Sequence, residues 1–148
     1  MINFHPPLSS FPAVTLVLAV ASELIAFFKR HNKLASNSYR VMAQRLIFIG
    51  CCFTCVTYLS GYFGEDQASQ TFEVPTNIIA THQAWAKAIL VSLIPLIIFT
   101  ILRNMSAKLA VNVLYYFFLT LSLGLTIYTS YLGGTLVFKH GAGVEVQE

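Results

Sequence analysis

Charged residues are scarce in this chain, because nine Lys or Arg and six Asp or Glu make up only 10% of its 148 residues. A soluble domain normally carries about 25% charged residues. This composition argues against a soluble enzyme, a disordered tail or a nucleic-acid-binding domain. Its three cysteines are too few and too clustered for a secreted disulfide framework. Neither a phosphate-binding G-x-x-x-x-G-K motif nor a G-x-S-x-G motif occurs, so nothing indicates phosphoryl or acyl transfer.

Apolar residues, in contrast, make up 56% of the chain and gather in four long stretches. A helix needs roughly 20 apolar residues to cross the hydrocarbon core of a bilayer. The four candidate spans are residues 11–28, 46–63, 84–102 and 109–138. They predict an all-α fold, an integral membrane four-helix bundle that forms a single domain over residues 1–148. No Lys or Arg precedes the first span, so we expect it to be retained rather than cleaved as a signal peptide.

The basic residues are distributed unequally between the two sides of this bundle. Seven of the nine fall in residues 29–45 and 103–108, which follow spans one and three. Cytoplasmic loops are enriched in Lys and Arg, so both termini are predicted on the outer side, the periplasm if this is a bacterial inner membrane. Residues 64–81 are expected to form a polar outer loop, and Pro95 is expected to kink the third span.

Three of the four histidines fall at this outer face: His5 precedes span one, His82 opens span three and His140 closes span four. Imidazole is a common metal ligand, and a helix bundle can hold a cofactor between facing helices. Two such imidazoles can ligate a haem iron, and Lys139 could supply a charge for the propionates. The alternative is that these histidines only cap helices or contact lipid headgroups. His31 lies in the basic loop and is expected to be solvated.

Two segments carry a resemblance to a known family. Residues 5–12, His-Pro-Pro-Leu-Ser-Ser-Phe-Pro, are similar to an HP-x-x-x-H-F-P opening, and residues 131–144, YLGGTLVFKHGAGV, are similar to a W-L-G-G-x-L-V-Y-R-H-G-x-G-V ending. His82 matches a histidine of that family and Glu23 an acidic position. On these motifs the chain resembles, over nearly its whole length, the transmembrane family called domain of unknown function 2231.

The resemblance implies a redox-associated membrane module for which haem binding is plausible. Ser10 stands where the family often has a second N-terminal histidine, so one haem b is expected rather than two. The leading hypothesis is a small b-type cytochrome module in the inner membrane. It would have no enzymatic activity alone and would pass electrons between a periplasmic or quinone-level donor and a larger redox complex. Two of His5, His82 and His140 would be the axial ligands, with His82 and His140 the favoured pair.

Two alternatives remain open from the sequence. The chain could be a cofactor-free accessory subunit that anchors a membrane electron-transfer complex. It could also hold Cu or Zn through the same three histidines with Glu65 or Asp66.

Glu23 is an ionisable residue inside the first span, where burying a charge costs at least a few kcal/mol. It could stay protonated, pair with a neighbouring helix, reach towards the basic loop, or transfer protons. If its role is structural, Glu23→Gln should leave both the haem spectrum and electron transfer unchanged. Cys51, Cys52 and Cys55 lie in an apolar span, where packing explains them better than redox chemistry does.

Overall fold

The computed structural model describes residues 5–71, 74–106 and 108–142, and in these residues it contains only helices. The five helices are α1 (His5–Leu8), α2 (Ser10–Phe28), α3 (Lys33–Thr71), α4 (Thr76–Met105) and α5 (Leu109–His140). Four of them, α2 to α5, are long and apolar enough to cross a membrane. The predicted all-α fold with four membrane-spanning helices is therefore confirmed.

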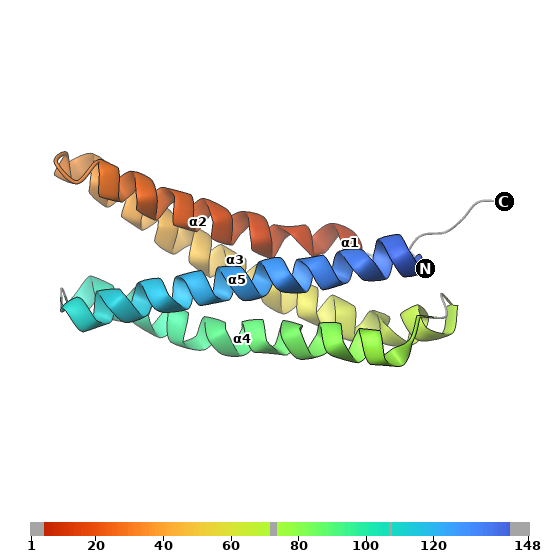
Figure 1. Cartoon of the computed structure of the whole chain (residues 1–148). Helices are drawn as coiled ribbons and strands as arrows, with labels where there is room; N and C mark the ends of the chain where they lie inside the picture. Colours follow the sequence, from red (N-terminus) through yellow and green to blue (C-terminus); the bar gives the residue numbers. More distant parts are fainter. Residues whose placement is uncertain (1–4, 72–73, 107, 143–148) are drawn as a thin grey trace.

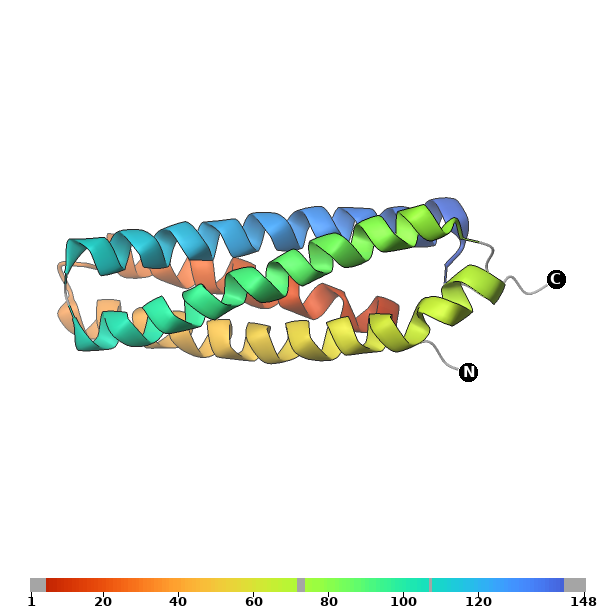
Figure 2. The ribbon, with the colours of Figure 1, turned by 90° about the horizontal axis from the view of Figure 1, so that it is seen from below.

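The long helices pack as a ring in which α2 contacts α3, α3 contacts α4, α4 contacts α5, and α5 contacts α2. Successive helices run in opposite directions (Figure 1). The α2–α3 and α4–α5 turns therefore lie at one end of the bundle, and both ends of the chain lie at the other (Figures 1 and 2). We call these the turn end and the terminal end. The short helix α1 packs against α3 at the terminal end.

The helices are longer than the hydropathy pattern predicted at two places. Helix α3 begins at Lys33 rather than near residue 46 and continues to Thr71, and α4 begins at Thr76 rather than near residue 84. The predicted outer loop over residues 64–81 is therefore wrong, because most of it is helical. Polar residues end a membrane span but not a helix, since backbone hydrogen bonding does not depend on side-chain polarity. Pro75 precedes α4 and suits a helix start, where no intrahelical N–H bond is needed.

The end of α5 shows how local sequence stops a helix. Gly141 has a left-handed backbone with φ of 67°, its N–H donates to the Val137 carbonyl, and the Ala142 N–H donates to the Leu136 carbonyl. This bonding pattern satisfies carbonyls that the last helical turn leaves without partners, and glycine adopts the required φ at little cost. In α4, Pro95 lies inside the helix without ending it.

The bundle core combines large apolar side chains with small hydroxyls. Leu16, Leu96, Tyr115 and Leu119 are fully buried where the four helices meet.

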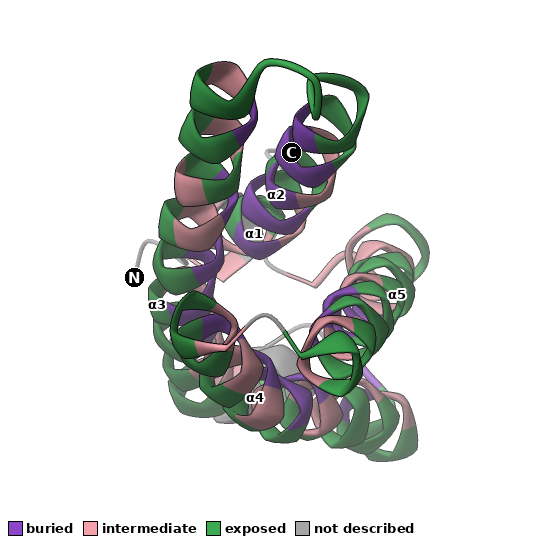
Figure 3. Cartoon of the chain, turned by 90° about the vertical axis from the view of Figure 1, so that its left-hand side faces the viewer, coloured by how far each residue is buried: buried purple, intermediate pink, exposed green. Residues whose placement is uncertain are grey.

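The lipid-facing surface is more apolar than a soluble protein would tolerate. Each of the four long helices carries large exposed apolar side chains, of which Phe138 on α5 is an example. Buried positions face the bundle axis and exposed ones face outwards (Figure 3). This pattern fits lipid as the surrounding solvent, in which apolar exposure costs little.

Candidate functional site

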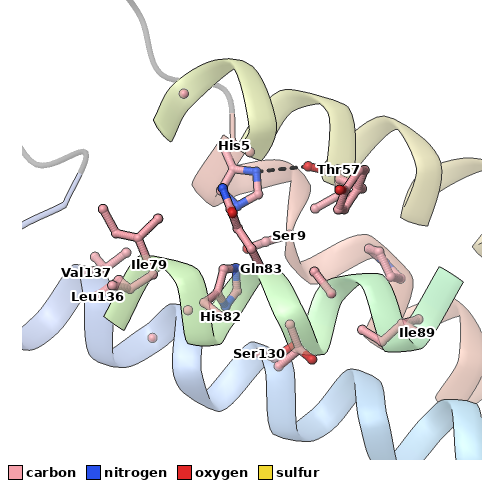
Figure 4. A pocket seen from close by; sticks show the side chains of 18 of the residues that line it. His5, Ser9, Thr57, Ile79, His82, Gln83, Ile89, Ser130, Leu136 and Val137 are labelled. Carbon is pink, nitrogen blue, oxygen red and sulfur yellow. Dashed lines mark hydrogen bonds between the residues drawn. The ribbon is translucent and has the colours of Figure 1, made fainter. Parts of the chain in front are cut away.

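A cavity of about 360 Å³ opens within the bundle at its terminal end. All five helices contribute to its wall, which is mainly apolar but includes several hydroxyl and amide side chains. The two imidazoles His5 and His82 lie on this wall (Figure 4). A concave, mostly apolar cavity with a few convergent polar groups is the usual form of a ligand-binding site.

The antiparallel topology brings the two histidines together across this cavity. His5 lies on α1 and His82 lies in the second turn of α4, and the centroids of their rings are 6.3 Å apart with the ring planes nearly perpendicular, at 84°. All of α2 and all of α3 lie between these two residues along the chain. Their proximity follows from the alternation of helix direction, which returns α4 to the end where the chain begins.

His5 is held in place by α3. Its Nδ1 atom lies 3.1 Å from the backbone oxygen of Thr57 and 2.9 Å from the hydroxyl oxygen of Ser60. The Thr57 hydroxyl donates in turn to the backbone oxygen of Leu8, at 3.2 Å. Burial lowers the pKa of His5 below its ordinary value, and the hydrogen bond with Thr57 opposes this effect only partly. Polar contacts thus tie helix α1 to α3, and burial favours the neutral form of the His5 imidazole.

His82 contains a buried polar atom without a partner. Its Nδ1 atom is shielded from solvent and makes no hydrogen bond to any residue that the structure describes. An unsatisfied buried donor or acceptor costs about 1–3 kcal/mol, and most buried polar groups in proteins are paired. The ring that carries this atom is part of the cavity wall.

Two glycines make room for the two rings. A Cβ atom at Gly61 on α3 would lie 2.7 Å from Cε1 of His5, and one at Gly133 on α5 would lie 3.2 Å from Cε1 of His82. Carbon atoms in ordinary contact are about 3.5–4.0 Å apart. Any larger residue at either position would therefore displace an imidazole, so the glycines and the histidines form one packing unit.

We expect Gly61→Ala to reduce stability by about 1–3 kcal/mol relative to Gly124→Ala, because the added methyl overpacks the His5 ring. Both glycines lie inside helices, so the gain in helix propensity is the same for both and cancels. Nothing lies within 4 Å of a Cβ at Gly124. Thermal unfolding of the two variants in the same detergent measures the difference. Equal melting temperatures would show that His5 does not pack against Gly61 as described.

The structure places the other predicted site residues outside this cavity. His140 is the last residue of α5, seven residues beyond Gly133, which corresponds to about 10 Å along a helix axis. It therefore lies beyond the level of His82, and it is not among the described residues that line the cavity. Lys139 is exposed at the same end. The structure therefore brings His82 next to His5 at the cavity wall, and does not place His140 of the favoured pair there.

The predicted three-histidine cluster is not formed within the described residues, where no group of three His, Cys, Asp or Glu side chains could hold a metal ion. The side chains of Glu65 and Asp66, considered with it, lie outside the description. His31 is exposed in the α2–α3 turn, at the opposite end of the bundle, as expected.

Glu23 lies in a second polar cluster, near the turn end of the bundle. Its carboxylate is only 5% exposed and accepts two hydrogen bonds from Arg103, at 2.7 and 3.2 Å. The hydroxyls of Tyr115 and Tyr116 donate to the same two oxygens, at 3.0 and 2.9 Å. Arg103 also donates through Nε to Asn112, at 3.0 Å. The cluster joins α2, α4 and α5 through a fully hydrogen-bonded ion pair.

Of the roles open to Glu23 from the sequence, the structure shows pairing with another helix, because its partner Arg103 lies on α4, across the bundle from α2. From the sequence alone, Arg103 counted only among the basic residues that follow span three. A usable signal existed, because Glu23 and Arg103 both lie towards the turn end of spans one and three, which run in the same direction. Leu16, Leu96 and Leu119 are buried between this cluster and the cavity. This leucine layer separates the ion pair from the histidines.

Comparison with known proteins gives one match. No curated protein and no solved structure matches the chain. The family described as predicted membrane protein, DUF2231, matches residues 1–146. This match covers both the histidine-bearing N-terminal segment and the end of α5, which carried the resemblance in the sequence. The chain therefore belongs to the DUF2231 family of predicted membrane proteins.

Proposed function

We propose that this chain is a membrane-embedded haem b module that passes electrons within a larger redox complex. One haem would bind in the cavity at the terminal end, with His5 and His82 as its axial ligands. The observation that carries the proposal is the pair of imidazoles whose rings lie 6.3 Å apart on the cavity wall.

The two imidazoles lie close enough together for both to hold one cofactor in this cavity. The contact from His5 Nδ1 to the Thr57 carbonyl supports this further, because metal-ligating histidines almost always donate their other ring N–H to such a group.

The surrounding residues fit a flat, largely apolar group. The rings of His5 and His82 pack against Gly61 and Gly133, and the apolar wall of the cavity includes Ile79, Ile89 and Val137. When bound, haem supplies a one-electron couple whose potential depends on its axial ligands and on the polarity around it. The residues of this chain would hold the group, orient the imidazoles and keep the site in an apolar environment.

An absorption spectrum of the purified protein tests the proposal. We expect haem added to the protein in detergent to give the sharp bands of a low-spin b-type centre on reduction, at one haem per chain. A Cu or Zn site would give metal by elemental analysis without these bands, and a cofactor-free anchoring subunit would give neither. A spectrum identical to that of haem in empty micelles would contradict the proposal.

We further propose that the chain lies in the inner membrane with both termini on the periplasmic side. The support is the charge distribution, because seven of the nine basic residues lie towards the turn end and cytoplasmic loops are enriched in such residues. Reporter fusions at the two termini should therefore be active only with a periplasmic enzyme. Activity of a cytoplasmic reporter at the N-terminus would overturn this orientation and place the cavity on the inner side.

A further inference from the structure

We infer that the turn end of the bundle is a binding surface for anionic phospholipids of the leaflet that surrounds it. This surface lies at the end opposite the cavity, and its role does not depend on haem binding or on which side of the membrane the turn end faces. Two observations carry the inference, an unbalanced set of exposed cations and the exposed apolar side chains beside them.

The turn end has positive charges without matching negative ones. Glu23 is the only Asp or Glu in residues 1–64, and residues 74–142 contain none. The Glu23 carboxylate is buried and already paired with Arg103. Figure 3 looks onto this end, where the α2–α3 turn is exposed. Six further cations here are exposed and form no ion pair within the described part of the chain: Lys29, Arg30, Lys33, Arg40, Arg45 and Lys108.

Large apolar side chains lie beside these cations at both turns. Phe28, Leu34, Met105 and Leu109 are each between 74% and 81% exposed, and three of the four are immediate chain neighbours of a lysine. Such exposure is unfavourable in water but costs little against acyl chains. The turn end thus presents positive charge and apolar surface side by side. This combination is complementary to a lipid with a negative headgroup and apolar chains.

Arg30 shows the same arrangement within a single contact. Its guanidinium carbon lies 4.8 Å from the centre of the Phe27 ring, and Phe27 is itself exposed. Long basic side chains at the ends of membrane helices lay their stems along apolar surface and keep their charge at the headgroup level. The contact with Phe27 therefore holds the Arg30 charge at the boundary between an apolar helix face and the region beyond the helix end.

A nucleic acid or an acidic protein would also neutralise the six cations. Neither matches the apolar side chains beside them as acyl chains do, so the lipid is the better occupant. A cluster of about four to eight Lys or Arg residues next to a membrane helix is typical of anionic lipid binding, and each cation strengthens that binding about five-fold. The six unpaired cations of the turn end fall within this range.

Thermal unfolding of the purified chain in a non-ionic detergent measures the binding, because a ligand of the folded state raises the unfolding temperature. We expect phosphatidylglycerol to reach half of its effect at a mole fraction at least about five-fold lower than phosphatidylcholine does. Raising NaCl from about 0.1 M to about 1 M should remove this difference, since the Debye length falls from about 10 to about 3 Å. Equal effects of the two lipids, or a difference that survives the higher salt, would overturn the inference.

A double variant locates the binding at the turn end. Lys29→Gln with Lys108→Gln removes one exposed cation from each turn and should raise the half-effective mole fraction of phosphatidylglycerol at least about five-fold. The matched control, Lys87→Gln with Lys139→Gln, removes two exposed cations from the part of α4 and α5 towards the terminal end and should leave this value unchanged. An unchanged value in the first variant, or an equal rise in the control, would show that the turn end does not bind the lipid.

Three other anions test the choice of a lipid as the occupant. Inorganic phosphate carries the headgroup charge without acyl chains, a polyglutamate peptide represents an acidic protein, and a short oligonucleotide represents a nucleic acid. We expect each of them to raise the unfolding temperature less than phosphatidylglycerol does at the same phosphate or carboxylate concentration. An equal or larger rise with any of the three would overturn the assignment to a lipid. Because no haem is added, these outcomes are separate from those of the haem titration.

Discussion

His82→Ala is expected to abolish the spectrum of bound haem. His82 lies within a long helix at the cavity wall, and under the proposed function its imidazole is one of the two that would hold the haem. Removing the ring takes away one of two axial ligands and leaves an apolar void. We also expect His5→Ala to lose the low-spin bands, because no third histidine of the described chain lines the cavity. Haem titration followed by reduction measures both effects.

Two other histidines serve as matched controls for this experiment. His140→Ala removes an imidazole at the same end of the bundle but outside the cavity wall, and His31→Ala removes one at the opposite end. Both variants should bind one haem per chain with the wild-type spectrum. A normal spectrum in His82→Ala would show that His82 is not a ligand of the haem. Loss of the spectrum in His140→Ala and His82→Ala, but not in His5→Ala, would favour the pairing of His82 with His140 over the proposed one.

Glu23→Gln is expected to lower the free energy of unfolding by about 3–5 kcal/mol, as is usual when one partner of a buried ion pair is removed. The amide keeps the shape of the carboxylate but not its charge, so the Arg103 guanidinium would be left without a counter-ion in the bundle interior. The four hydrogen bonds that now converge on two carboxylate oxygens could not all be retained, because an amide has one acceptor oxygen. Thermal unfolding in detergent measures the loss.

A charge change at the surface provides the control. Arg45→Gln also alters one charge towards the turn end, but Arg45 is exposed, and such substitutions usually change stability by no more than about 0.5 kcal/mol. The double variant Glu23→Gln with Arg103→Gln should recover part of the loss, since it removes the uncompensated charge. A Glu23→Gln variant as stable as Arg45→Gln would show that the ion pair contributes nothing.

The same variant separates the ion pair from the cavity. Roughly 25 Å of chain at 1.5 Å per residue separates His5 from Glu23, and the layer of Leu16, Leu96 and Leu119 lies between the cluster and the cavity. The haem spectrum of folded Glu23→Gln protein should therefore match the wild type. The sequence predicted an unchanged spectrum and unchanged electron transfer for this change; the ion pair with Arg103 adds an expected loss of stability.

The helix boundaries show where local sequence information was sufficient. The predicted spans 11–28 and 109–138 agree closely with α2 and α5, because Lys29 and the glycine at 141 coincide with both the end of the apolar run and the end of the helix. The other two spans are shorter than α3 and α4. There, hydropathy marks which residues suit lipid, while the helix continues through polar residues whose backbone remains hydrogen-bonded.

The sequence by itself determined the membrane class, the number of spans, their alternation and the placement of His5, His82 and His140 at one end of the bundle. These properties depend on the order of apolar and charged segments, which can be read along the chain. Only the tertiary structure decided that His82 lies beside His5, that glycines accommodate the two rings, and that Glu23 pairs with Arg103. Such pairings depend on the rotation and axial offset of one helix against another. Those are set by packing among all four helices, and no single segment encodes them.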